Sequence, residues 1–134
     1  MAEKTVVKEV LTDEMIEAGA ELTRRLDLTS LSVNASLWLY SPESGIWRLI
    51  IASPEVATSG PKKAYRKIRS VLFEKPEGLG GMVLSDISVV EDYDPLISLL
   101  STAVRTENGI SGIRFSRNTI NGQFIDDAYI YRLA

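Results

Sequence analysis

The segment 113–132 constrains the fold most, because apolar and polar residues alternate on both sides of the pair Asn121-Gly122. Asn-Gly is the preferred pair for a two-residue type I′ turn, in which both central residues need positive φ. The pattern therefore predicts an antiparallel β-hairpin. In its register Ile120 lies opposite Gln123, and this pairing decides which side chains share a face.

The predicted register gives the hairpin two different faces. One face places Arg117 opposite Asp126 among apolar neighbours: Ile113, Phe115, Phe124, Ala128 and Ile130. We expect this pair to be structural, since breaking a partly buried ion pair from one side costs several kcal/mol. The other face carries Ile120 and Ile125 and should be less buried. Its polar residues are a candidate interface with a partner: Arg114, Asp127, Tyr129 and Tyr131.

Hydrophobic periodicity and breaker residues predict the remaining elements. They are a helix at 12–27, strands at 31–40 and 46–52, a helix from Pro61 to Lys75, a strand at 86–90 and a helix from Pro95 to Asn108. The strict alternation of 31–40 predicts a half-buried strand, and the wide apolar arc of the last helix predicts the most buried helix. The fold class is α+β: a five-stranded, mostly antiparallel sheet with three helices, in the order α-β-β-α-β-α-β-β.

A length of 134 residues predicts one domain spanning 1–134, large enough to need neither a disulfide nor a metal. Residues 1–10 are equally compatible with an earlier start of the first helix, a short strand and a flexible arm. The Gly-rich loop 77–81 is the best candidate for disorder or a hinge. No apolar run suits a signal peptide or a membrane span, so we expect a cytoplasmic protein without a membrane partner.

The composition excludes much chemistry, because the chain has no Cys and no His. Thiolate nucleophiles, Ser-His-Asp catalysis and the usual zinc and haem sites are therefore absent. Carboxylates with Mg²⁺ remain possible, and the candidates are Asp86, Glu91, Asp92, Asp94, Asp126 and Asp127. No Asp/Glu-x-Lys pair of the restriction-nuclease type occurs, and turn or capping roles explain the acids near Asp94. We assign no catalytic residue, metal or cofactor.

The predicted second helix is strongly basic in a chain whose formal net charge is −3. Five cations occur within eight residues without an intervening acid: Lys62, Lys63, Arg66, Lys67 and Arg69. Helical spacing places Lys62, Arg66 and Arg69 on one side, with Lys63 and Lys67 beside them, which suits an acidic protein, a phosphate group or nucleic acid. The alternative interpretation is an ordinary solvated helix face.

Several segments resemble uncharacterised bacterial proteins of similar length. They are Trp47-Arg-Leu-Ile-Ile-Ala-Ser-Pro54, Gly60-Pro-x-x-Ala-Tyr65, Gly109-Ile-Ser-Gly-Ile-Arg-Phe115 and Asp127-Ala-Tyr-Ile-Tyr-Arg132. The resemblance covers most of the chain from Trp38 onward and implies a bacterial origin, but no activity or site residue.

The sequence thus favours a non-enzymatic binding or interaction domain that contacts an acidic or phosphate-bearing partner through the basic helix. One alternative is a Mg²⁺-dependent enzyme acting on phosphoesters. Another is a structural homodimer that pairs through the aromatic face of the sheet. Separately, Trp38, Tyr40 and Trp47 are expected to cluster near the tip of the first hairpin.

Overall fold

The computed structural model describes residues 9–134, so the predictions made for residues 1–8 lie outside the described residues. Its five strands are β1 (Ala35–Ser41), β2 (Ile46–Ser53), β3 (Ile87–Glu91), β4 (Ile113–Ile120) and β5 (Gln123–Leu133). They form one sheet in the order β3-β2-β1-β5-β4. The β2–β3 pair is parallel and the other three pairs are antiparallel. The α+β class is confirmed, with a mixed sheet.

Among residues 9–134, four α-helices accompany the sheet: α1 (Asp13–Asp27), α2 (Glu55–Ser59), α3 (Pro61–Glu74) and α4 (Pro95–Ala103). Thr12 caps α1 by accepting from the Met15 amide, and Asp94 caps α4 by accepting from the Leu96 amide. The short α2 is absent from the prediction, since Ser53-Pro54 suggests only a break. The prediction that the last helix reaches Asn108 is wrong, because the chain is already extended at Val104.

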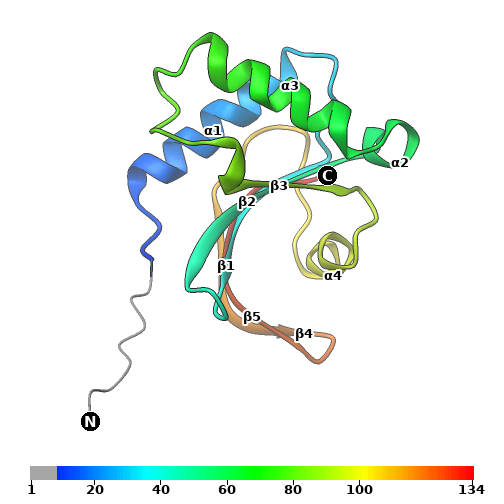
Figure 1. Cartoon of the computed structure of the whole chain (residues 1–134). Helices are drawn as coiled ribbons and strands as arrows, with labels where there is room; N and C mark the ends of the chain where they lie inside the picture. The colour runs from blue at the N-terminus through cyan, green and yellow to red at the C-terminus, as the bar shows by residue number, and fades with distance from the viewer. Residues whose placement is uncertain (1–8) are drawn as a thin grey trace.

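The helices lie in two layers, with α1 and α3 on one face of the sheet and α4 on the other (Figure 1). The sheet curves around α4 (Figure 1). One apolar cluster joins Leu22 of α1 and Ile68 of α3 to Trp38, and the other joins Leu100 of α4 to Leu37. Because β1 is central and covered on both faces, the prediction that its segment is half-buried is wrong.

The prediction that α4 is the most buried helix is also wrong. Only Ile97 and Leu100 are buried in α4, whereas α1 buries five residues. The reason is that α4 is short and meets the sheet along one flank. Leu96 and Leu99 are only partly buried there.

The closing hairpin has its predicted turn and most of its predicted register. Asn121 and Gly122 both have positive φ, and Ile120 pairs with Gln123. The predicted Arg117–Asp126 ion pair is wrong. Arg117 has a φ of 46°, and the ladder skips Arg117 and Asp126 together before it resumes in the same register at Asn118 and Ile125. Among residues 9–134, no ion pair joins these two side chains.

The irregular residue at Arg117 also changes which face the hairpin tip presents. Ile120 and Ile125 belong to the same apolar cluster as Phe115 and Ile130, although strict alternation places them on opposite faces. The assignment of Ile120 and Ile125 to the polar face is therefore wrong. A left-handed residue rotates the strand locally, so the face that points inward differs on its two sides.

The loop after α3 packs against α1. Leu79 is buried in the core, and Arg25 of α1 donates hydrogen bonds to the carbonyls of Lys75 and Glu77. The loop predicted as a hinge is thus attached to the first helix along its length. None of the helices among the described residues is long and apolar enough to cross a membrane.

Candidate functional site

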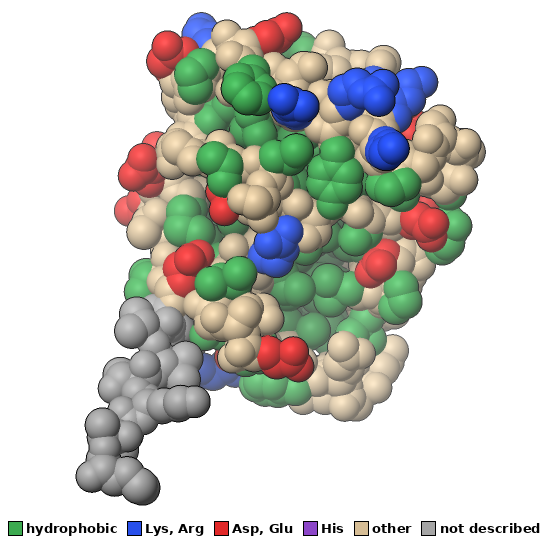
Figure 2. Space-filling model, viewed as in Figure 1, with side chains coloured by type: hydrophobic (Ala, Val, Ile, Leu, Met, Phe, Trp, Pro, Cys, Tyr) green, Lys and Arg blue, Asp and Glu red, His purple; other side chains and the backbone are tan. Residues whose placement is uncertain are grey.

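The basic residues of α3 lie on the side that faces away from the sheet. Ala64, Ile68 and Val71 form the buried side of this helix. The opposite side is exposed along most of its length, and Figure 2 shows Lys and Arg side chains gathered over α3. Four of the five predicted cations are exposed there and are called the basic face below: Lys62, Lys63, Arg66 and Arg69.

The cations of the basic face have no acidic partner within the described part of the chain. Lys62, Lys63 and Arg66 make no ion pair or side-chain hydrogen bond among residues 9–134. Lys67 differs, since its Nζ lies 2.5 Å from Ser30 Oγ and 3.6 Å from a carboxylate oxygen of Glu55. Lys67 therefore joins α3 to neighbouring segments, and the other four carry the unneutralised charge.

An apolar groove of about 330 Å³ adjoins the basic face. It lies between the end of α3 and the returning chain before β3, and its lining residues are Arg69, Leu72, Phe73, Met82, Val83 and Leu84. Phe73 is 73% exposed and Val83 is 53% exposed. Two large apolar side chains thus remain in solvent directly beside the exposed charges.

The basic face and the apolar groove form one continuous surface. A second hollow, of about 290 Å³, is lined by Lys62, Tyr65, Arg66, Arg69 and Leu84. It shares Arg69 and Leu84 with the groove. The Arg69 guanidinium carbon lies 5.5 Å from the centroid of the Phe73 ring, so a cation–π contact joins the two surfaces at their boundary.

Phe73 is absent from the predicted binding residues, although the sequence contains a signal for it. At about 100° per residue, Phe73 falls within about 40° of Lys62, Arg66 and Arg69 on the helix surface. An aromatic residue in the middle of a cationic side is unusual for a solvated helix. Met82 and Val83 gave no comparable signal, because they reach α3 only through the path of the following loop.

The predicted interface residues on the hairpin are mainly engaged with one another. Arg114 binds Asp127 through two hydrogen bonds of 2.7 and 2.6 Å, and Ser116 Oγ donates to the same carboxylate at 2.7 Å. Burial raises the pKa of Asp127, but the hydrogen bonds from Arg114 and Ser116 outweigh it and hold that pKa below its ordinary value. Arg114 also lies over the Trp47 ring, at 5.4 Å from its centroid.

The other two residues of that predicted interface lie deeper. Tyr131 is only 1% exposed and donates through its hydroxyl to the Ile16 carbonyl of α1 at 2.5 Å. Burial raises the pKa of Tyr131 well above its ordinary range. Tyr129 is half-buried and meets the Tyr131 ring edge-on. The expectation of a less buried face is therefore wrong at Tyr131.

The aromatic residues at the first hairpin are packed inside the monomer. Tyr40 and Trp47 lie opposite each other across β1 and β2 with ring centroids 5.5 Å apart, so their predicted contact is confirmed. Trp38 is buried beneath α1 and donates from its indole to Tyr131 Oη at 3.0 Å. These buried rings offer little surface to a second copy of the chain.

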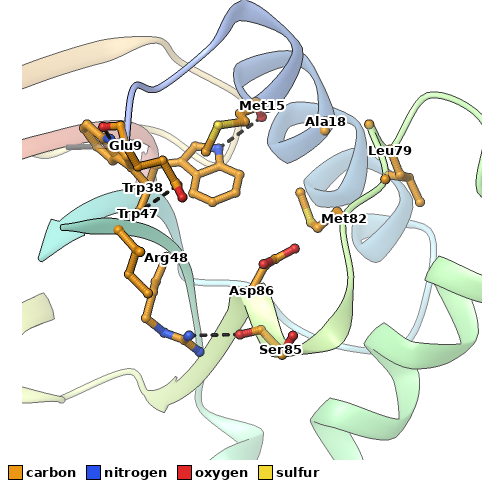
Figure 3. A pocket seen from close by; sticks show the side chains of 13 residues that line it. Glu9, Met15, Ala18, Trp38, Trp47, Arg48, Leu79, Met82, Ser85 and Asp86 are labelled. Carbon is orange, nitrogen blue, oxygen red and sulfur yellow. Dashed lines mark hydrogen bonds between the residues drawn. The ribbon is translucent and has the colours of Figure 1, made fainter. Parts of the chain in front are cut away.

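A cavity of about 460 Å³ opens between α1, β2 and the loop before β3 (Figure 3). Its polar side chains already serve local structure. Arg48 donates to Ser88 Oγ at 2.8 Å, to the Ser85 carbonyl at 2.9 Å and to the Ile87 carbonyl at 3.2 Å. Asp86 accepts from the Val83 amide at 2.9 Å. These contacts hold the loop against β2.

The acidic residues considered for Mg²⁺ are spread over the structure. Within residues 9–134, no three carboxylates come together in a group able to hold a metal ion. Asp94 caps α4, and Asp86 accepts from the backbone of its own turn. Asp127 is paired with Arg114.

No protein-family model, no curated protein and no solved structure matches the chain. The resemblance to uncharacterised bacterial proteins stays a prediction.

Proposed function

We propose that the chain is a non-enzymatic binding domain whose basic face contacts an acidic or phosphate-bearing partner. One observation carries the proposal: Lys62, Lys63, Arg66 and Arg69 project from one side of α3, and no carboxylate of the described residues neutralises them. Like charges this close repel one another. A ligand that brings negative charge removes the repulsion and is attracted by all four cations.

The expected strength of this attraction follows from the exposure of the side chains. A single exposed ion pair contributes only about 0–1 kcal/mol, so one carboxylate is not held firmly. A ligand with several negative groups engages the cations together, and its affinity depends strongly on ionic strength because the Debye length shortens with salt. The basic face therefore favours a polyanionic surface over a small monoanion.

The overall charge of the chain adds orientation to this attraction. The formal net charge is −3, so the surface outside α3 repels a polyanion on average. An acidic partner is thus steered to α3 and away from other faces. Such charge complementarity acts chiefly on association rate and on orientation.

Isothermal titration with poly-L-glutamate tests the proposal, with poly-L-lysine as the polymer of opposite charge. We expect binding of poly-L-glutamate at about 50 mM NaCl that weakens severalfold at about 300 mM NaCl. Poly-L-lysine should bind to the acidic surface outside α3, so Lys62→Glu with Arg66→Glu should weaken the binding of poly-L-glutamate and leave that of poly-L-lysine undiminished. Absence of poly-L-glutamate binding at low salt, or binding indifferent to salt, would contradict the proposal.

A further inference from the structure

We infer that the partner is an acidic polypeptide segment with a bulky apolar side chain that fills the apolar groove. This inference rests on the proposed function and specifies the partner of the same surface. Two kinds of surface adjoin at Arg69. The basic face carries positive charge without an acidic partner, and the apolar groove exposes apolar side chains to solvent.

The groove supplies apolar contacts that a purely electrostatic surface lacks. Phe73 and Val83 are the exposed apolar residues of its lining, and Leu72, Met82 and Leu84 are half-buried. Covering such side chains with an apolar group is favourable in proportion to the area removed from water. Met82 adds a flexible side chain that can adapt to the shape of the inserted group.

The positions on α3 set the spacing that the partner must have. Arg66 precedes Phe73 by seven residues and Lys62 precedes it by eleven, or about 10 and 16 Å along the helix axis. Carboxylates of the partner should therefore lie about 10–16 Å from its apolar anchor. A helical partner meets this spacing with acidic residues two to three turns from the anchor.

Two features favour a polypeptide over a nucleic acid. The groove is walled mainly by aliphatic side chains and methionine, which suit an apolar side chain better than a hydrophilic base edge. The one aromatic ring in the groove lining, Phe73, already has the Arg69 guanidinium near one face, so its stacking surface is reduced.

The concave shape of the groove distinguishes it from a membrane-inserting surface. Insertion into a bilayer requires apolar side chains that protrude beyond the surrounding charges. Here Arg69 lines the groove together with the apolar residues, and the space between them admits a side chain from outside.

The test uses two synthetic acidic peptides of identical composition. In the first, a Leu-Phe anchor is followed by Glu residues two to three helical turns away, and in the second the same residues are scrambled. Fluorescence anisotropy of labelled peptides measures their affinity for the full chain. We expect the anchored peptide to bind about tenfold more tightly, which corresponds to about 1.4 kcal/mol.

Two variants of the chain test whether the difference in affinity between the two peptides depends on the groove. In Phe73→Ser with Val83→Ser, both changes are at exposed positions, so the fold should be retained. We expect this variant to bind both peptides with the weaker affinity. Lys62→Glu with Arg66→Glu should weaken both peptides together.

The outcomes separate the inference from the function on which it rests. If both peptides bind wild type equally, or if the groove variant keeps the preference, the inference is overturned and the proposed function stands. If neither peptide binds at low salt, the proposed function fails as well. A groove-dependent affinity for phosphatidylserine vesicles, combined with equal peptide affinities, would identify a membrane surface and overturn the polypeptide partner.

Discussion

Arg132 of β5 and Asp27 of α1 form a two-pronged ion pair, with Nη1 and Nη2 lying 2.9 and 2.8 Å from the two carboxylate oxygens. The Arg132 side chain is 3% exposed and also donates to the carbonyls of Val33 and Gly109. A register shift between β1 and β5 leaves Tyr131 unmatched, so Tyr131 and Arg132 both point toward α1. The pair therefore attaches the last strand to the end of the first helix.

Asp27→Asn should destabilise the chain by about 2 kcal/mol, because it leaves a buried guanidinium without its counter-charge. The cost should be below the roughly 3–5 kcal/mol of a fully buried pair, since the Asp27 side chain is 39% exposed and Arg132 keeps two carbonyl acceptors. Urea unfolding measures the change. The exposed pair of Arg24 and Glu21 provides the control, and Arg24→Gln should cost less than about 1 kcal/mol. Equal costs for the two variants would show that burial of Arg132 is unimportant.

Gly19→Ala should destabilise by about 2 kcal/mol, although alanine normally favours a helix over glycine by about 1 kcal/mol. A Cβ at this position would overlap the Tyr131 hydroxyl and lie 2.7 Å from Trp38 Nε1. Either α1 must move away from the sheet or the hydrogen bonds of Tyr131 must break. Thermal unfolding checks this result against Gly109→Ala, where nothing lies within 4 Å of the added Cβ. Stabilisation by Gly19→Ala would refute the close helix–sheet contact.

Asp127→Asn should remove stability at neutral pH and have little effect in acid. The pKa of Asp127 is lowered in the folded state, so its contribution is fully present above the unfolded pKa of about 4 and disappears as pH falls through the lower folded value. We expect a difference of about 1 kcal/mol near neutral pH, because Arg114 is about half exposed. Urea unfolding across this pH range measures it, with Asp126→Asn as the neighbouring control. A difference that grows toward low pH would have the wrong sign.

Tyr65→Phe should weaken the edge of the sheet at β3. The Val89 amide donates to Tyr65 Oη at 3.0 Å, and this contact covers a backbone group that the edge strand otherwise leaves without a strand partner. We expect a loss of about 1 kcal/mol and faster hydrogen exchange at Val89. Unchanged exchange at this amide would mean that the hydroxyl does not protect the edge.

Local signals in the sequence predicted the elements that depend on neighbouring residues. The Asn121-Gly122 turn, the Asp94 cap and the five strands follow from turn chemistry, capping and alternation. Alternation predicted the wrong buried face beyond Arg117. A single residue with positive φ changes which face points inward, and the residue types do not reveal it.

Features that depend on contacts between distant residues could not be predicted from the sequence. The burial of Arg132 depends on Asp27, which lies 105 positions earlier in the chain, and on the register shift beside Tyr131. The basic face was predictable because its residues lie on one helix. The apolar groove was not predictable from the sequence. Val83 lies near Phe73 because the intervening loop packs Leu79 into the core.

The most direct test of the proposed function compares two charge-reversal variants for binding to poly-L-glutamate at low salt. Lys62→Glu with Arg66→Glu alters the basic face, and Arg105→Glu with Arg117→Glu makes the same change in net charge at exposed residues outside α3. Melting temperatures measured beforehand establish that both variants fold. We predict that the first variant loses at least about tenfold in affinity and the second less than about threefold. Equal losses in the two variants would contradict a binding site on α3.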